Sequence, residues 1–280
     1  MRASDVRRAA SSRLRGSGVA SPERDAELLL AHVLDVPLGR LPLVEDLTED
    51  QLDRYDGLVA RRCAREPLQH LTGSAAFRHV ELLVGPGVFV PRPETELLAG
   101  WAVDRARALD GTPVVVDLCT GSGAIAKAVA DEVPAARVHA VELDPRAYAW
   151  AAENLGGGEV DLRQGDLADA FADLDGTVDV VVCNPPYIPL VAFEGVDVEA
   201  RTHEPDLALF SGDDGLDAIR VLERTAARLL VPGGWLGFEH ASEQGRAAPA
   251  VLERTGRWRD VRDHADLLDR PRFTTARLRG

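Results

Sequence analysis

Cysteine, lysine and long apolar runs are all scarce in this sequence of 280 residues. The three cysteines, Cys63, Cys119 and Cys183, are widely spaced and form no C-x-x-C pair. This pattern argues against a disulfide framework or a structural zinc and for a reducing compartment. The seven histidines show no metal-binding spacing, so we expect no metal. Apolar runs such as 27–34 and Val178–Cys183 stop far short of the ~20 residues that a bilayer needs, and the basic N-terminus has no apolar signal core. The sequence therefore predicts a cytoplasmic protein with no membrane partner.

Acidic side chains predominate among the charged residues. There are 46 Asp and Glu against 32 Lys and Arg, which gives a net charge of −14. An acidic surface repels phosphate backbones, so nucleic acid is not expected as the main partner. Hydrophobic residues at 45% and charged residues at 28% are ordinary for a globular protein and exclude intrinsic disorder and collagen.

The first part of the chain, residues 1–76, has helical patterning and no motif that carries chemistry. Pro22 sits where the first residue of a helix is expected, and Thr48 with Gln51 forms a capping-box pattern. We expect a small helical bundle here. Residues 77–92 are strand-like on both sides of a Gly-Pro-Gly sequence at 85–87, which predicts a β-hairpin connector.

From residue 93 to residue 280 strands alternate with helices. Strands are expected at 114–118, 138–142, 178–183 and 235–239, and helices at 94–109, 124–131, 145–155 and 216–230. Such alternation predicts an α/β domain with a doubly wound, mostly parallel sheet and helices on both faces.

A glycine-rich loop, Asp-Leu-Cys-Thr-Gly-Ser-Gly at 117–123, joins the first of these strands to its helix. Gly121 and Gly123 allow a tight turn and close approach to a ligand, although an ordinary strand–helix turn fits this loop equally well. Glu142 ends the next strand, nineteen residues beyond Gly123, where a carboxylate can accept hydrogen bonds from both ribose hydroxyls of a nucleoside. Asp166 follows a third expected strand and could bind an adenine amino group, or simply stabilise a turn.

The tetrapeptide Asn184-Pro185-Pro186-Tyr187 follows the buried strand at 178–183 and therefore lies at the same edge of the sheet as the glycine loop. Prolines stiffen the backbone and have no N–H to donate. The Asn184 amide oxygen and the Pro185 carbonyl can together accept both N–H bonds of a planar NH₂ group, on which Tyr187 can pack. This arrangement predicts a site that holds an NH₂ nitrogen for chemistry.

With these motifs the chain resembles the peptide chain release factor N5-glutamine methyltransferases, the PrmC/HemK family. The likeness runs over nearly the whole length, and the Pro-Arg-Pro-Glu-Thr-Glu segment at 91–96 makes it specific. The matching segments are residues 66–70, 89–96, 117–123, 184–188, 203–205, 208–209, 214–216, 232–234 and 239–240.

The resemblance implies a Rossmann-like class I methyltransferase domain that uses S-adenosyl-L-methionine and releases S-adenosyl-L-homocysteine. It implies a methyl transfer to the glutamine of the Gly-Gly-Gln motif in class 1 peptide chain release factors, with the N-terminal helices docking that protein. The implied cofactor-binding residues are Cys119, Thr120, Gly121, Ser122, Gly123, Glu142, Asp166, Leu167 and Asn184. Asn184, Pro185, Pro186 and Tyr187 would bind the substrate, and Asn184, Pro185 and Tyr187 would be catalytic.

The sequence departs from the family pattern at two positions and leaves two rival functions open. Cys119 stands where glycine is frequent, and Leu167 stands where an aromatic residue is common. One rival is a nucleic-acid base methyltransferase, because adenine presents the same two N–H hydrogens. The net charge and the lack of a basic target-recognition segment argue against it. The other is a non-catalytic adaptor, which an intact Asn-Pro-Pro-Tyr disfavours.

Overall fold

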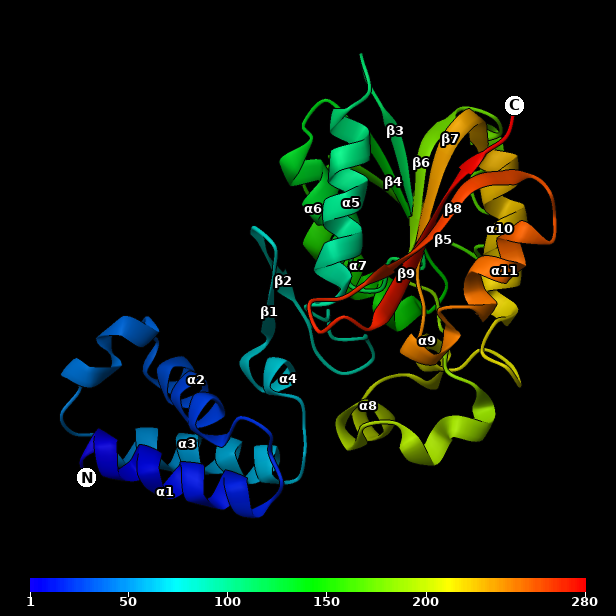
Figure 1. Ribbon diagram of the computed structural model, residues 1–280. Coiled ribbons are helices and arrows are strands. Elements are labelled where there is room, and N and C mark those ends of the chain that lie inside the picture. Colours follow the sequence, from blue (N-terminus) through cyan, green and yellow to red (C-terminus); the bar gives the residue numbers. More distant parts are fainter. The chain divides into compact units, whose positions relative to one another are not determined.

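The computed structural model describes residues 1–280, which fold into two compact units (Figure 1). The first unit comprises Met1–Ser74 together with Asp197–His203, and the second comprises Ala75–Val196 together with Glu204–Gly280. Nothing in the sequence pattern predicted that Asp197–His203 would group with the N-terminal residues. No helix in either unit combines the length and apolar content of a membrane-spanning segment.

The first unit is built from helices, as its patterning predicted. They are α1 (Ala3–Gly16), α2 (Pro22–Leu34), the 3₁₀ helix η1 (Leu38–Leu43), α3 (Glu49–Cys63), α4 (Leu68–Thr72) and α8 (Val198–His203). The expected capping box begins α3: Gln51 N–H donates to Thr48 Oγ1 over 3.3 Å, and Thr48 N–H donates to Gln51 Oε1 over 2.9 Å. Leu29, Leu30 and Val59 are fully buried in the core of this bundle.

A buried arginine on α3 holds the outlying helix α8 within the first unit. Arg62 donates to Asp25 Oδ2 of α2 over 2.7 Å and to Glu199 Oε1 of α8 over 2.8 Å. Arg65 adds a second bond to Glu199 Oε1, over 3.0 Å. Because Arg62 is only 5% exposed, these charges are screened little by water. This cluster explains why Asp197–His203 belongs to the N-terminal unit.

A hairpin is present, but its turn does not lie where the sequence pattern predicted it. Strands β1 (Ser74–Phe77) and β2 (Val80–Leu83) pair with each other, so the turn lies at Arg78 and His79 and not at Gly-Pro-Gly 85–87. Arg78 adopts φ +51° and donates to both carboxylate oxygens of Glu132, over 2.6 and 2.9 Å. This long-range ion pair stabilises a turn that lacks the usual glycine. Gly85 instead lies against Trp150, whose ring atom Cζ2 would be 2.6 Å from an added Cβ.

The second unit contains a seven-stranded sheet in the order β5-β4-β3-β6-β7-β9-β8. Strands β3 to β7 run parallel, and the last two strands are antiparallel to their neighbours. This confirms the predicted fold class. The strands are β3 (Val114–Leu118), β4 (Arg137–Glu142), β5 (Val160–Gln164), β6 (Val178–Cys183), β7 (Leu230–Glu239), β8 (Trp258–Ala265) and β9 (Pro271–Leu278).

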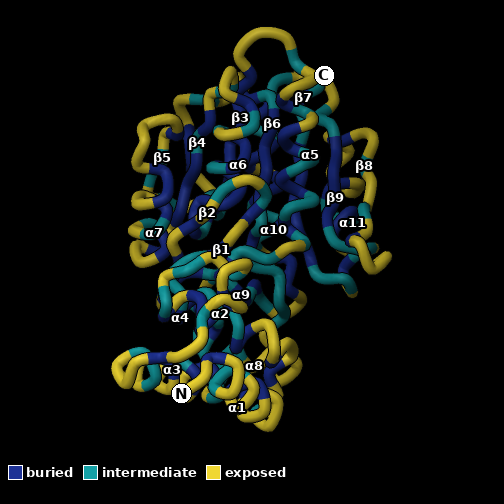
Figure 2. Tube along the Cα trace, turned by 90° about the vertical axis from the view of Figure 1, so that its left-hand side faces the viewer, coloured by how far each residue is buried: buried dark blue, intermediate teal, exposed yellow.

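Helices cover both faces of this sheet (Figure 1). One face packs against α5 (Thr95–Arg107), α6 (Ala124–Glu132) and α7 (Pro145–Leu155), and the other packs against α10 (Asp217–Leu229) and α11 (Ala247–Glu253). The central strands are buried nearly throughout, whereas exposed residues concentrate in the connections (Figure 2). The remaining short helices are η2 (Ala172–Leu174), η3 (Leu190–Gly195), α9 (Asp206–Leu209) and η4 (Ser242–Gln244).

The strand register aligns the ends of the four central strands. Leu118 of β3 pairs with Val141 of β4 and with Cys183 of β6, and Cys183 pairs with Phe238 of β7. The next residue on each strand therefore reaches the same edge, which brings together the glycine loop, Glu142, Asn184 and Glu239. The chain order reverses between β3 and β6, and ligands of open α/β sheets bind at such a point.

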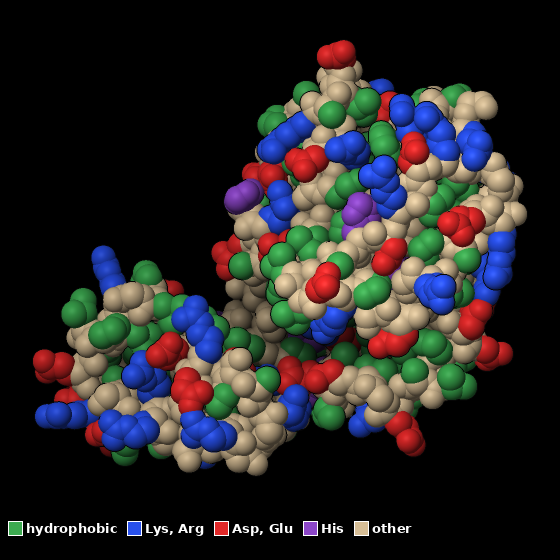
Figure 3. Space-filling model, in the orientation of Figure 1, with side chains coloured by type: hydrophobic (Ala, Val, Ile, Leu, Met, Phe, Trp, Pro, Cys, Tyr) green, Lys and Arg blue, Asp and Glu red, His purple; other side chains and the backbone are tan.

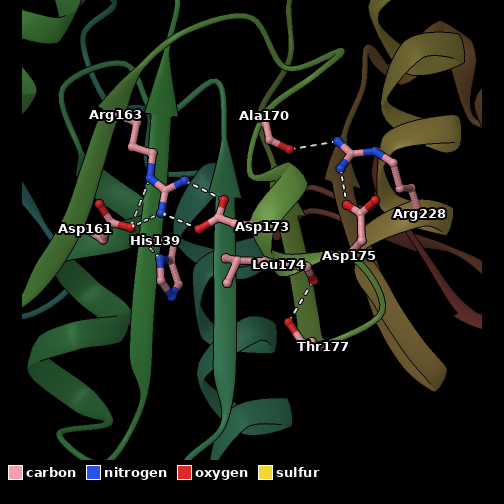
Figure 4. A network of polar contacts seen from close by, with 9 residues as sticks. All are labelled: His139, Asp161, Arg163, Ala170, Asp173, Leu174, Asp175, Thr177 and Arg228. Atoms are coloured by element: carbon pink, nitrogen blue, oxygen red, sulfur yellow. Dashed lines mark hydrogen bonds and ion pairs between the residues drawn. The ribbon is translucent and has the colours of Figure 1, made fainter.

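Ion pairs hold the later part of the connection between β5 and β6 (Figure 4). Arg163 donates to Asp161 Oδ2 over 2.7 Å and to Asp173 Oδ1 over 2.6 Å. Arg228 of α10 forms an ion pair with Asp175. These partly exposed pairs each contribute little to stability, but together they order the segment that begins just after the predicted cofactor residue Asp166.

Candidate active site

The glycine loop after β3 leaves open space beside one of its glycines. Cys119, Gly121 and Gly123 all have positive φ angles, of 59°, 59° and 87°. A Cβ added to Gly121 would meet no atom within 4 Å, whereas one added to Gly123 would lie 3.0 Å from Leu155 of α7. Gly123 is thus needed for packing of the loop against a helix, and Gly121 borders a space that a ligand can enter.

Asp117, at the end of β3, is hydrogen-bonded to this loop and to the first turn of α6. Its Oδ2 accepts hydrogen bonds from Thr120 Oγ1 over 2.6 Å and from the backbone N–H of Ala126 over 3.1 Å. Its Oδ1 is buried and has no hydrogen-bond partner. Burial raises the pKa of this carboxyl to about 7, although the two hydrogen bonds oppose the rise. Asp117 lies in the glycine-rich motif but is not among the residues predicted for the site.

Glu142, at the end of β4, is hydrogen-bonded to the glycine loop. Its carboxylate is only 9% exposed and accepts from the backbone N–H groups of Gly121 over 2.9 Å and Asp144 over 2.8 Å. Burial raises its pKa, while these N–H groups act in the opposite direction. A carboxylate has about four acceptor sites, so two backbone bonds leave capacity for hydroxyl donors from a ligand.

Asp166 and Leu167 lie next to this half of the site. Gly165 N–H donates to the Glu142 carbonyl over 3.0 Å, which places the start of the β5–β6 connection beside Glu142. Asp166 is exposed, and its Oδ1 accepts from Ala168 N–H over 2.9 Å in a local turn. Leu167 is half-buried against the core. Both predicted positions are at the expected edge of the sheet, and Asp166 also has the turn role considered as its alternative.

The Asn-Pro-Pro-Tyr tetrapeptide after β6 is held by side chains from distant parts of the sequence. Asn184 is half-buried, and its Nδ2 donates to Thr95 Oγ1 of α5 over 3.3 Å. The Tyr187 hydroxyl donates to Glu239 Oε1 at the end of β7 over 3.1 Å. Gln244 Nε2 donates to the Tyr187 carbonyl over 3.0 Å, which fixes the backbone at the end of the tetrapeptide.

The carboxylate of Glu239 links these contacts. It is 1% exposed, and its second oxygen, Oε2, accepts from Thr95 Oγ1 over 2.7 Å. Burial raises its pKa, while the two hydroxyl donors and the positive charge of Arg272 oppose that rise. Burial, and then the neighbouring Glu239 charge, also raises the pKa of Tyr187, so its hydroxyl stays a donor at neutral pH.

The Pro-Arg-Pro-Glu-Thr-Glu segment is joined to a second motif of the resemblance. Arg92 donates to both oxygens of Glu204 at 2.8 Å, and Val90 N–H donates to Glu204 Oε1 over 3.2 Å. The Glu204 side chain has no exposed surface. This carboxylate therefore ties two chain segments together.

Sequence reasoning missed three buried polar residues of the site: Asp117, Thr95 and Glu239. All three lie in segments that carried the family resemblance, but the pairing of Thr95 with Glu239 spans 144 positions and has no local signal. No group of three or more His, Cys, Asp or Glu side chains is arranged to hold a metal ion.

Comparison with known proteins agrees with this geometry. The family model for the PrmC N-terminal domain matches residues 5–73, and that for the methyltransferase small domain matches residues 102–194. The release factor glutamine methyltransferase of Streptomyces coelicolor is 59% identical over 269 residues, which cover 96% of this chain and 95% of the relative.

Two other similarities show how far the fold and the family extend. A 4-amino-L-phenylalanine/4-methylamino-L-phenylalanine methyltransferase of Streptomyces pristinaespiralis is 44% identical over 89% of this chain and 86% of its own. The hMettl16 catalytic domain, solved in complex with the MAT2A 3′UTR hairpin 6, superposes with a TM-score of 0.53 at 14% identity, over 71% of this chain and 75% of that one. The latter shows a shared fold only. From the near full-length identity of 59%, the chain belongs to the release factor glutamine methyltransferase family.

Proposed function

We propose that this protein transfers a methyl group from S-adenosyl-L-methionine to the side-chain amide nitrogen (N5) of the glutamine in the Gly-Gly-Gln motif of class 1 peptide chain release factors. S-adenosyl-L-homocysteine is the second product, and one proton of the amide nitrogen is released to water. The observation that carries the proposal is the hydrogen bond from Asn184 Nδ2 to Thr95. It turns the amide nitrogen of Asn184 away, so that its oxygen remains available to accept an N–H from a substrate amide.

The residues at the ends of β3 and β4 fit the proposed cofactor. Space beside Gly121 admits a ligand against the backbone, and buried Glu142 retains acceptor capacity for ribose hydroxyls. The unpartnered, buried Oδ1 of Asp117 offers an acceptor that a cationic amino group would satisfy. Thr120, Ser122 and the other loop residues complete this cradle. When bound, the cofactor supplies an electrophilic methyl group on a sulfonium.

The chain's own contribution to the reaction is positioning. A glutamine amide nitrogen is a poor nucleophile, because its lone pair is delocalised into the carbonyl group. Acceptors at Asn184 Oδ1 and the Pro185 carbonyl would hold both N–H bonds and stabilise the positive charge that develops on nitrogen. Fixing the nitrogen in line with the methyl group can supply about 7–11 kcal/mol of the barrier reduction. Tyr187, tethered through its hydroxyl to Glu239, would pack against the planar amide.

A nucleic-acid base methyltransferase remains the rival reading, because an adenine NH₂ fits the same acceptors. Acidic and basic side chains are interspersed over the face of the molecule in Figure 3, and the net charge is −14. Phosphate backbones are bound by clustered positive charge, so neither observation favours nucleic acid.

The test is mass spectrometry of a purified class 1 release factor after incubation with the protein and methyl-labelled S-adenosyl-L-methionine. We expect one labelled methyl group on the glutamine of the Gly-Gly-Gln motif. The matched control substrate is the same factor with that glutamine changed to glutamate, which has no amide nitrogen and should remain unlabelled.

Parallel reactions with DNA, RNA and 4-amino-L-phenylalanine test the other NH₂ acceptors. Label on nucleic acid alone would replace the proposal with the base-methyltransferase reading. Label on the arylamine alone would replace it with the activity named for the Streptomyces pristinaespiralis relative. Tight binding of the cofactor with no acceptor labelled would leave the adaptor reading.

A further inference from the structure

Three side chains from separate elements form a buried polar chain that ends at Asn184. Asn184 Nδ2 donates to Thr95 Oγ1 over 3.3 Å, and Thr95 Oγ1 donates to Glu239 Oε2 over 2.7 Å. Thr95 is 4% exposed and Glu239 is 1% exposed, so water does not compete for these bonds. The second oxygen of Glu239 is occupied by the Tyr187 hydroxyl, at 3.1 Å.

The donors and acceptors in this polar chain fix the direction of each of its hydrogen bonds. Both oxygens of Glu239 accept hydrogen bonds, one from Thr95 and one from Tyr187, so the single hydroxyl proton of Thr95 points toward the carboxyl group. The oxygen of Thr95 then has only lone pairs to offer Asn184. A side-chain amide presents an N–H₂ end and an oxygen end, and only the N–H₂ end can bind a lone pair. The orientation of the Asn184 amide is therefore set by a buried carboxyl group that acts through Thr95.

The Thr95 hydroxyl bonds to the polar side chains Glu239 and Asn184 and not to its own helix. Thr95 is the first residue of α5, one position after the N-cap residue Glu94, and no side-chain hydrogen bond caps this helix. The helix start is stabilised by backbone bonds instead, such as Thr95 N–H to the Arg92 carbonyl, over 3.1 Å. Its hydroxyl is thus committed to Glu239 and Asn184.

We propose that Thr95 and Glu239 are positioning residues. They hold the Asn184 amide with its oxygen facing the group to be methylated, so that the site selects a substrate nitrogen that carries N–H donors. The inference rests on the proposed role of Asn184 as the group that accepts from the substrate nitrogen. If the amide were reversed, its N–H₂ end would face the N–H bonds of the substrate, and donor would meet donor. Neither Thr95 nor Glu239 needs to touch the substrate for this effect.

The first test compares Thr95→Val with Thr95→Ser. Valine has nearly the shape of threonine but can neither donate nor accept, whereas serine retains the hydroxyl. We expect Thr95→Val to lower kcat for the release factor about 10-fold, the loss that one hydrogen bond represents, with the Kd for S-adenosyl-L-methionine within about twofold of wild type. Thr95→Ser should retain kcat within about threefold. Equal kcat values for wild type and Thr95→Val would overturn the proposal.

A double-mutant cycle separates a positioning role from a merely structural one. If Thr95 acts through Asn184, adding Thr95→Val to Asn184→Ala should lower the residual rate by less than about twofold. A structural role would give the same additional loss in both backgrounds, and that result would refute the inference. Glu239→Gln extends the cycle, because glutamine has one acceptor oxygen and cannot serve both Thr95 and Tyr187 as an acceptor.

A readout independent of turnover keeps this inference separate from the proposed function. The side-chain NH₂ signal of Asn184, assigned in ¹⁵N-labelled protein by its loss in Asn184→Ala, should be protected from hydrogen exchange in wild type and in Thr95→Ser. Protection should be lost in Thr95→Val. Equal protection in all three proteins would overturn the orientation argument. Failure to methylate release factors, with this pattern intact, would instead refute the choice of substrate.

Discussion

The two halves of the site hold their carboxylates in different ways. At the ends of β3 and β4, Asp117 and Glu142 accept hydrogen bonds mainly from backbone N–H groups that lie 2 to 21 positions away. At the ends of β6 and β7, Glu239 accepts from the hydroxyls of Thr95 and Tyr187, which lie 144 and 52 positions away. The proposed cofactor half therefore uses mostly backbone donors at shorter sequence separations, whereas the proposed acceptor half uses side chains from more distant positions.

From this difference we propose separate tasks for the two halves. A backbone cradle is suited to bind a constant cofactor, because its donors are the same whatever the side chains. An acceptor site must discriminate between chemical groups, and side chains can be exchanged to do so. Substitutions in the cofactor half should thus change affinity for the cofactor, and substitutions in the acceptor half should change the rate of transfer.

Asn184→Ala removes the side-chain amide that is proposed to accept a hydrogen bond from the substrate nitrogen. We expect kcat for methyl transfer to fall by about 10³-fold or more, because a preorganised group that stabilises developing charge is lost. The Kd for S-adenosyl-L-methionine, measured by calorimetry, should change by at most about threefold, with the thermal midpoint near that of wild type. A large loss of cofactor affinity without a loss of kcat would reverse the assignment of the two halves.

Asp117→Asn removes a buried acid from the cofactor half. The folded-state pKa of Asp117 is about 7 against an ordinary value of 3.8, so the unfolded chain releases this proton at lower pH than the folded protein does. The contribution of Asp117 to stability is therefore complete below about pH 4 and is lost as pH rises through 7. At about 1.4 kcal/mol per pH unit, the loss reaches up to about 4 kcal/mol.

The measurement is the free energy of unfolding by urea for both proteins between pH 4 and pH 8. The variant has no titrating group at this position, so its stability relative to wild type should increase as the pH rises. A constant difference across this range would mean that Asp117 is ionised throughout in the folded state.

The same contrast explains what the sequence could predict. Strands β3 and β6 and helix α7 have the bounds that the apolar runs and the proline at 145 predicted, and Glu142 meets the glycine loop as expected. These features follow from short-range patterns and the register of parallel strands. The partnership of Thr95 with Glu239 depends instead on α5 packing beside the end of β7, which no local pattern encodes. The misplaced hairpin turn has a similar cause, since Arg78 depends on Glu132 for its position.

Glu142→Gln tests whether the cofactor half acts on affinity alone. Glutamine has a single acceptor oxygen and no charge, so one of the N–H groups of Gly121 and Asp144 would lose its partner. We expect the Kd for S-adenosyl-L-methionine to rise about 10- to 30-fold, with kcat at saturating cofactor within about threefold of wild type. Calorimetry and initial rates at several cofactor concentrations measure the two quantities. A fall in kcat with unchanged affinity would place Glu142 in the acceptor half instead.

Gly121→Ala and Gly111→Ala form a matched pair for the smallest effect. Both glycines have positive φ angles, of 59° and 85°, and an added Cβ would meet no atom within 4 Å at either position. Each substitution should therefore cost about 1–2 kcal/mol of unfolding free energy through backbone strain alone. Only Gly121 borders the proposed cofactor, so only Gly121→Ala should also raise the Kd for S-adenosyl-L-methionine, by about 10-fold, since the new methyl group occupies space that the ligand needs. If both variants bind the cofactor as wild type does, the open space beside Gly121 is not part of the cofactor site. The glycine loop would then not belong to the cofactor half, and the proposed division of the site would be wrong.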